Sequence, residues 1–451
     1  MSLSNADLTH LLLALVLLLV AAHGLGWLCT RLRQPRVAGE ILGGLLLGPT
    51  LFGLVAPSWQ HAVFAGGRAT PAALGVFYQL GLMLLMYCSG AELRSLLARR
   101  ERKATFGIAL LANAAPFLAG VAFLRVYDAG RFLGRAHDRA AFTLVFALAM
   151  AVTSIPVIAR IMADLGILAT RFARVVLSVA VLEDLLVYVV LNFALALVAP
   201  PRAESFSLPA VLGIRPASAL GNGYYMVVTL ACFALPALLG PGLVGRLAVA
   251  RGNPLHRASP IGFQLAFLLA VTGLAAFLGV SPIFGALLAG LLAGDLRGDA
   301  EQARQTIQGF AYACFIPIYF AIVGLRLDLV HQFDPRFFVF FLTFACLIKT
   351  ASAYAGARLA GEGKPGARNL AVALNARGGP GIVLASVAFD AGIINLAFYT
   401  ILVMLALVTS ILAGSWLEAT LRRGHALLTE PQTAPGTAPE IDAPSARSRV
   451  D

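Results

Sequence analysis

The sequence predicts an all-α polytopic membrane protein with about thirteen transmembrane helices. Hydrophobic residues make up 59% of the 451 residues, and charged residues only 12%, against roughly 25% charged residues in a typical soluble protein. Apolar windows of about 20 residues, the length that crosses a bilayer as a helix, recur along the whole chain. Basic residues gather in alternate loops between these windows. An ordinary soluble enzyme is therefore excluded.

Each window is separated from the next by clusters of Arg, Gly and Pro. The first is expected to be a membrane helix and not a secretory signal, because its leader contains an aspartate and no lysine or arginine. The expected spans, with boundaries soft by several residues, are 8–29, 37–55, 72–93, 104–124, 141–163, 172–199, 224–248, 260–279, 281–296, 307–327, 337–358, 368–390 and 395–420.

The loops predict an orientation. Those on one side of the membrane hold 21 lysines and arginines, and those on the other side hold 9. The positive-inside rule therefore places the N-terminus outside and the C-terminus in the cytoplasm. Charges scattered in this way do not form a nucleic-acid surface. Residues 424–451, rich in Pro, Ala and Thr, are expected to be a disordered cytoplasmic tail.

An internal repeat is visible in the glycine patterns. The stretches 41–48 and 283–290 share the pattern I-x-G-x-L-L-x-G, and 90–93 and 324–327 share G-x-x-L. An odd number of predicted helices separates the copies, so they are expected to lie inverted in the membrane. Inverted repeats are common in transporters that expose a central site alternately to the two sides.

Two adjacent acids lie in the middle of an apolar window. Glu183 and Asp184 are expected about 15 Å from either face, and neighbouring residues of a helix point about 100° apart. Lys349 is also deep in an apolar window. Charges at this depth are costly and are expected to be paired or functional. A purely structural ion pair is the alternative, but it needs one acid and two are present.

The window 141–163 is expected to be interrupted near its middle. It contains Thr153, Ser154 and Pro156, and proline removes a backbone donor from a helix. Freed carbonyls and the two hydroxyls are hard oxygen ligands that suit a small cation. A simple proline kink is the alternative interpretation.

The window 368–390 is expected to be interrupted in the same way. Here Gly378, Gly379 and Pro380 follow Arg377, so a simple kink is less favoured. Broken helices bring the positive amide ends and the negative carbonyl ends of half-helices together. We expect Arg377 to neutralise the carbonyl ends. The histidines and cysteines show no metal-ligand spacing, so no metal or cofactor is expected.

Seven stretches resemble the monovalent cation:proton antiporter superfamily, in the branch of bacterial Na+/H+ and Kef-type K+/H+ exchangers. They are GEILGGLLLGPTLFG, LGLMLLMYCSGAEL, TSIPVIARIMADLG, VLEDLLVYVVL, SPIFGALLAGLLAG, FIPIYFAIVGLRLDL and NARGGPGIV. The resemblance implies an antiporter fold with crossed discontinuous helices and a homodimer in the bacterial inner membrane. It implies a transmembrane domain over 1–423, with scaffold helices at about 8–93 and 260–327 and core helices at about 104–199 and 337–420.

The resemblance also implies roles for individual residues. Asp184 matches the ion-binding aspartate, Glu183 the residue before it, and Lys349 the basic residue that pairs with the site. Thr153 and Ser154 match the unwound crossover, and Arg377 a second basic position there. Related exchangers carry Asp-Asp, Asn-Asp or Gln-Asp where this chain has Glu-Asp, so the stoichiometry stays open.

The expected function is secondary active exchange of Na+ or K+ against H+, by alternating access and competition at Asp184. A Kef-like K+/H+ exchanger, an efflux channel-like transporter and a transport-dead membrane sensor remain alternatives. An enzyme is not expected, because no catalytic metal cluster and no nucleophile with its base is spaced along the chain.

Overall fold

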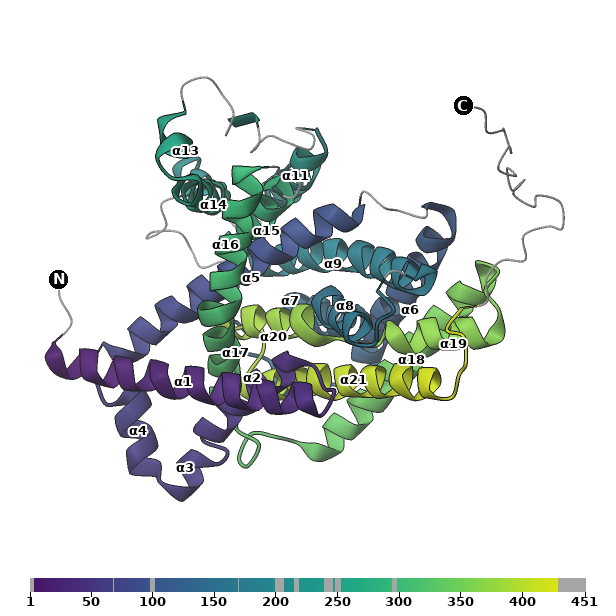
Figure 1. Ribbon diagram of the computed structural model, residues 1–451, viewed down its shortest axis with the longest axis horizontal. Helices are drawn as coiled ribbons and strands as arrows, with labels where there is room; N and C mark the ends of the chain where they lie inside the picture. The colour runs from purple at the N-terminus through teal and green to yellow at the C-terminus, as the bar shows by residue number, and fades with distance from the viewer. Residues whose placement is uncertain are drawn as a thin grey trace, which may run out of the picture.

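The computed structural model describes residues 4–67, 69–97, 102–168, 170–198, 207–214, 219–238, 246–247, 253–293 and 298–428. These residues form helices and loops, with one isolated antiparallel bridge between Leu133 and Ile394. The helices, drawn in Figure 1, are α1 Asn5–Arg31, α2 Arg36–Leu47, α3 Phe52–Val55, α4 Pro57–Ala65, α5 Thr70–Leu97, α6 Arg102–Val126, α7 Arg139–Ala151, α8 Ile155–Asp164, α9 Arg171–Leu197, α10 Leu208–Val211, α11 Ala219–Leu238, α13 Pro254–Ala258, α14 Pro260–Phe277, α15 Pro282–Ala293, α16 Asp299–Phe310, α17 Ile316–Leu325, α18 Pro335–Leu359, α19 Lys364–Ala373, α20 Gly378–Asp390 and α21 Leu396–Arg422.

Apolar helices dominate the described chain, as the composition predicts. Ten segments are long and apolar enough to cross a membrane, and three shorter apolar segments accompany them: α7, residues Gly223–Cys232 within α11, and α15. The expected all-α membrane fold is confirmed, whereas the count of thirteen spans stays a prediction. The windows 141–163 and 368–390 are each divided into two helices, α7 with α8 and α19 with α20.

The expected tail is ordered at its beginning. Leu427 is buried, and its carbonyl accepts a hydrogen bond from Asn369 Nδ2 at 3.2 Å. Apolar side chains at 427 and 428 pack against the hydrophobic core, which explains why the chain stays fixed beyond residue 424. Residues 429–451 of the expected tail lie outside the described residues.

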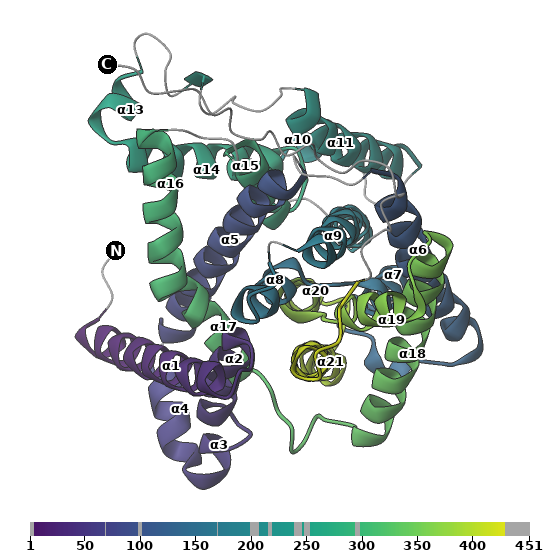
Figure 2. The ribbon, with the colours of Figure 1, turned by 45° about the vertical axis from the view of Figure 1, so that its right-hand side comes forward.

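The helices pack in two groups. The first helix group contains α1, α2, α5 and α14–α17, and the second contains α6–α9 and α18–α21. Helix α11 contacts α9 of the second group and α15 of the first. In Figure 2, α8, α9, α20 and α21 lie in the middle of the view, with α1, α2, α5 and α16 to one side of them. The two divided windows therefore both belong to the second helix group.

Glycines allow helices of the first group to pack backbone to backbone. Gly44 of α2 and Gly324 of α17 face each other's helix, as do Gly90 of α5 and Gly290 of α15, and a Cβ atom at any of the four would overlap backbone atoms of the facing helix. In the predicted repeat, α2 corresponds to α15 and α5 to α17. Each copy thus packs on the other through the same kind of contact, which supports the inverted repeat.

We expect Gly90→Ala to lower the thermal unfolding midpoint of the purified protein, because its methyl group would force α5 and α15 apart. Overpacking of this kind costs about 1–3 kcal/mol. Gly75→Ala in the same helix is the matched control, since a Cβ there meets nothing within 4 Å. Alanine favours a helix over glycine by about 1 kcal/mol, so the control should melt at the parent temperature or above. Equal midpoints for the two variants would contradict the close contact.

Candidate functional site

Two broken helices cross at the centre of the second helix group. Residues 152–154 between α7 and α8 and residues 374–377 between α19 and α20 are not helical. The two breaks are joined directly: Ser154 N donates to Ala376 O at 2.6 Å, and Thr153 Oγ1 donates to Leu374 O at 2.5 Å. The crossing brings together two helix C-termini and two helix N-termini, with opposite partial charges.

Local sequence explains the first break. Pro156 is the second residue of α8, and Ser154 is its N-cap, with a hydroxyl that accepts from Val157 N at 3.4 Å. The same hydroxyl accepts from Gly379 N at 3.0 Å. Both lone pairs of Ser154 Oγ are therefore used by backbone amides. Ser154 fastens α8 to α20 in this conformation.

The second break needs glycine at the point of contact. A Cβ atom at Gly378 would lie 2.8 Å from Ser154 Oγ and would also overlap the side chain of Val157. The amide of Gly378 donates to Ser410 Oγ at 3.2 Å. Pro380, in the first turn of α20, has no amide to satisfy there. The helix N-terminus is thus fixed partly by side chains of α21 and α8.

The guanidinium of Arg377 covers the carbonyl end of α7. Its Nε donates to Ala149 O at 3.2 Å and its Nη2 to Met150 O at 3.2 Å. Further bonds run to Ala345 O at 3.1 Å and to Asn375 Oδ1 at 3.2 Å. Arg377 is buried, and these acceptors offset the desolvation of its charge. The positive charge lies where the helix dipole is negative.

Lys349 of α18 pairs with Glu183 and not with Asp184. Its ammonium lies 2.8 Å from Glu183 Oε1, and both side chains are 0% exposed. Lys349 Nζ also donates to the carbonyl of Ala151, the last residue of α7. A buried ion pair is retained only with good geometry and further hydrogen bonds. Lys349 and Glu183 therefore form a compensated unit beside the crossing.

Asp184 lies next to this unit and forms no salt bridge with any residue in the described part of the chain. Its side chain is buried, and Oδ1 has no hydrogen-bond partner among the residues that the structure describes. The same holds for Glu183 Oε2 and for the hydroxyl of Tyr188. Tyr188 follows Asp184 by one helical turn, so both lie on one face of α9. The two carboxylate oxygens are acceptors that a proton or a small cation would satisfy, and the Tyr188 oxygen has lone pairs that can bind a cation.

A cavity of about 470 Å³ leads to the crossing from one end of the bundle. We call it the Glu40 cavity. Its walls come from α2, α5, α8, the π-helical segment Ala311–Phe315, α17 and α20, and include Glu40, Glu92, Arg160, Gly379 and Pro380. Glu40 is buried and its Oε1 accepts from Arg36 Nε at 2.9 Å. The start of α20 is therefore accessible from this end.

The structure brings the residues selected from the sequence into one region. Thr153, Ser154, Pro156 and Arg377–Pro380 form the crossing, and Lys349 joins α7 to Glu183. Sequence reasoning missed Tyr188, whose four-residue spacing from Asp184 was available as a signal. It included Asn375 in the stretch NARGGPGIV but gave it no role; in the structure Asn375 accepts from Arg377 and donates to Thr350 Oγ1 at 2.8 Å.

We expect Lys349→Met to lower the free energy of unfolding by about 3–5 kcal/mol, because it leaves Glu183 buried without its partner. The double variant Lys349→Met/Glu183→Gln removes both charges and should recover most of that loss. Thermal and denaturant unfolding of the detergent-purified variants measure both effects. A double variant no more stable than Lys349→Met would contradict the compensated pair.

Comparisons with known proteins identify the family of this chain and its fold. The sodium/hydrogen exchanger transmembrane family matches residues 14–423. The solved structure of the sodium proton antiporter MjNhaP1 from Methanocaldococcus jannaschii at pH 8 superposes with a TM-score of 0.61 at 15% identity, covering 92% of this chain and 98% of that one. That likeness concerns the fold alone.

Curated relatives are cation/proton antiporters by name. K(+)/H(+) antiporter 1 of Saccharomyces cerevisiae is 27% identical over 419 residues, which cover 90% of this chain and 46% of the relative. Na(+)/H(+) antiporter NhaS4 of Synechocystis sp. is 26% identical over 422 residues, covering 90% and 95%. The chain thus spans about half the length of the yeast relative and nearly all of the cyanobacterial one. With a family match over most of its length, the chain belongs to the sodium/hydrogen exchanger family.

Proposed function

We propose that this protein exchanges a monovalent cation for protons across the membrane by competition at Asp184. The main support is that the Asp184 carboxylate is buried in a membrane helix and forms no salt bridge with the described residues. Next to it, Glu183 and Lys349 already neutralise each other in an ion pair. In apolar surroundings such a carboxylate is stabilised either by a proton or by a bound cation. Either passenger neutralises Asp184, and neither can bind while the other is present.

The ligand set of the proposal follows from the free acceptors. Asp184 Oδ1, Glu183 Oε2 and the Tyr188 hydroxyl lack hydrogen-bond partners within the described residues, and Thr153 Oγ1 keeps acceptor capacity while it donates to Leu374. Ser154 Oγ is occupied by two amides, so we assign it to the crossing and not to direct ion binding. Hard oxygen ligands of this kind suit Na+, Li+ or K+.

In the proposed movement, the second helix group moves relative to the first. We assign the first helix group to the scaffold and the second to the moving core, as the resemblance implies, because both broken helices and both acids belong to the second group. Rocking of the core would expose Asp184 alternately to the two sides. A homodimer through the scaffold is proposed on the resemblance alone.

In the proposed orientation, the Glu40 cavity lies at the cytoplasmic end of the protein. The basic loop between α1 and α2 lies at the same end as the last turn of α21, because Arg33 forms an ion pair with Glu418, which also binds Arg422. The positive-inside rule then puts this end, with the C-terminus, in the cytoplasm. Bacterial relatives from Synechocystis and Enterococcus hirae favour a bacterial inner membrane.

We expect purified protein in liposomes to couple cation gradients to proton movement. Na+, Li+, K+ and Rb+ are added separately while internal pH is followed with a trapped dye. Exchange should saturate with cation, and the apparent KM should rise as the pH on the cation side falls, with little change in maximal rate, because protons compete for Asp184. A KM independent of pH would contradict competition at one site.

The matched variants for this experiment are Asp184→Asn and Asp328→Asn. The first removes the titrating group and should reduce exchange to the level of protein-free liposomes. The second alters an acid in the loop between α17 and α18 and should keep the parental rate. Normal exchange by Asp184→Asn would eliminate the proposed site.

From the arrangement of charges we also propose a stoichiometry of one proton per cation. Lys349 is 2.8 Å from Glu183, so this pair need not change protonation when Asp184 changes its passenger. The site then carries the same charge with a cation as with a proton. One proton is exchanged for each cation, without net charge movement.

We expect proton flux to stop when the pH difference equals the cation gradient. In liposomes clamped at zero membrane potential, a tenfold Na+ gradient should be balanced by about one pH unit. Two protons per cation would shift the balance to about half a pH unit. A balance at the smaller value would show that a second group, such as Glu183 or Lys349, also releases a proton.

A further inference from the structure

A carboxylate at the far end of α20 joins the two helix groups. Asp390, the last residue of α20, lies 2.8 Å from Arg326 Nη1 through Oδ1 and accepts a hydrogen bond at 2.8 Å from the Tyr78 hydroxyl through Oδ2. Arg326 follows α17 and Tyr78 belongs to α5. Both carboxylate oxygens of a residue in the second helix group are therefore held by the first helix group.

Further contacts tighten this junction. The guanidinium of Arg326 stacks 4.3 Å from the centre of the Tyr78 ring. Within the second helix group, Arg135 Nη2, from the loop between α6 and α7, donates to the backbone carbonyl of Asp390 at 3.0 Å and so fixes the end of α20. One turn deeper on α20, Ser386 accepts from the hydroxyl of Tyr319 of α17 at 3.4 Å. The contacts between the two helix groups thus continue from Asp390 along α20 toward the interior of the protein.

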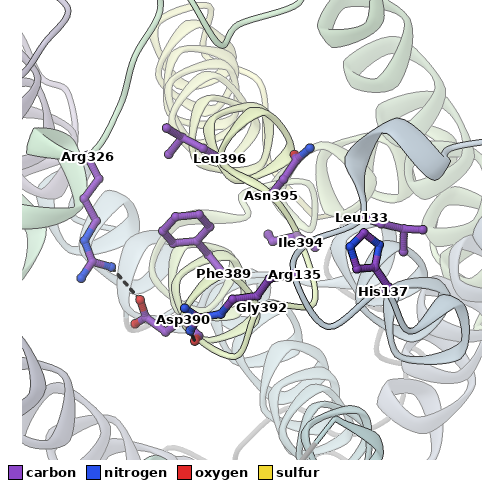
Figure 3. A pocket seen from close by; sticks show the side chains of 11 residues that line it. Leu133, Arg135, His137, Arg326, Phe389, Asp390, Gly392, Ile394, Asn395 and Leu396 are labelled. Carbon is purple, nitrogen blue, oxygen red and sulfur yellow. Dashed lines mark hydrogen bonds and ion pairs between the residues drawn. The ribbon is translucent and has the colours of Figure 1, made fainter.

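The junction borders a solvent-facing pocket. This Asp390 pocket has a volume of about 700 Å³, and Arg135, His137, Arg326, Asp390 and Asn395 are among its lining residues. Figure 3 shows Arg326 reaching across to Asp390, with Arg135 beside it. Side chains of Arg326 and Asp390 are 30% and 32% exposed. Water therefore reaches the ion pair, whereas Tyr78 and Ser386 behind it are buried.

The two ends of the interface between the helix groups differ. At the other end α2, α5 and α17 part from α8 and α20 to form the Glu40 cavity, which reaches Gly379 and Pro380. At the Asp390 end the same helices α5, α17 and α20 are tied together by charged and hydroxyl groups. The structure is open toward the crossing on one side and closed on the other.

We propose that Arg326, Asp390 and Tyr78 form a latch between the two helix groups that must release before the central site can be reached from the Asp390 pocket. This inference rests on the proposed alternating access and identifies the contacts that hold one of its two conformations. A partly exposed pair contributes modestly because solvent screens it. The latch can therefore favour one conformation and still open during each transport cycle.

The test measures access and not transport. Ser386→Cys is introduced into a background in which Cys29, Cys88, Cys232, Cys314 and Cys346 are replaced by serine, and a membrane-impermeant maleimide is added to intact cells and to inverted vesicles. Ser386 is 0% exposed, so the parent should label slowly from the Asp390 side. We expect Asp390→Asn and, separately, Tyr78→Phe to raise the labelling rate about tenfold in intact cells, which corresponds to about 1.4 kcal/mol.

The matched control is Asp334→Asn. Asp334 lies 3.0 Å from Arg131 with a similar exposure of 31%, but it belongs to the second helix group together with α7 and α18, so its loss should leave labelling at the parental rate. The exchanged pair Arg326→Asp/Asp390→Arg should return labelling toward the parental rate.

The latch would be overturned if both Asp390→Asn and Tyr78→Phe labelled at the parental rate in intact cells and also in inverted vesicles. Size-exclusion profiles of the variants show that each is folded, and Tyr78→Phe removes only one hydroxyl. Since labelling needs no cation, a failure of antiport leaves this result readable. Exchange without any change in labelling would reject the latch and keep the proposed function.

Discussion

The hydrogen bond between Ser154 N and Ala376 O is the contact on which the site depends. It fixes two interrupted helices against each other in the middle of a membrane fold, where an unpaired backbone group costs several kcal/mol. The non-helical segment between α7 and α8 supplies the amide, and the one between α19 and α20 supplies the carbonyl, so each break satisfies a backbone group of the other. Two separate proline or glycine kinks would leave both groups unsatisfied. The crossing is therefore stable only as a pair.

Charge follows from this geometry. The last carbonyls of α7 point into the protein, and two buried cations, Arg377 and Lys349, are placed against them. Lys349 has a second partner in Glu183, while Arg377 is satisfied by carbonyls and an amide oxygen. Arg377 and Lys349 thus bind backbone carbonyls, and Glu183 is the acid that pairs with Lys349. Asp184, next in the chain but about 100° around the helix, is left with no salt bridge to any of the described residues, which is why we propose it as the carboxylate that binds the proton or the cation.

Much of this arrangement could be predicted from the sequence, for physical reasons that apply locally. Hydropathy determines the spans, because a bilayer requires about 20 apolar residues. Proline and clustered glycine determine the breaks, and rare intramembrane charges indicate the site. The choice of Glu183 over Asp184 by Lys349 could not be predicted, since it depends on the rotation of α9 relative to α18. The hydrogen bond from Gly379 N to Ser154 Oγ and the junction of Tyr78, Arg326 and Asp390 could not be predicted either, because they join segments far apart in the chain.

The difference between the two ends of the molecule is informative when the repeat is considered. Gly44 with Gly324 and Gly90 with Gly290 make the same kind of backbone contact between corresponding helices, so the packing within the first helix group gives no reason to prefer one side. The preference must come from contacts with the second helix group, which do not repeat: Asp390 is bound at one end, while Gly379 and Pro380 face a cavity at the other. A few polar contacts are suited to that purpose. In the proposed alternating access, such contacts would add too little free energy to prevent exchange between two similar packings, and enough to shift which packing is populated.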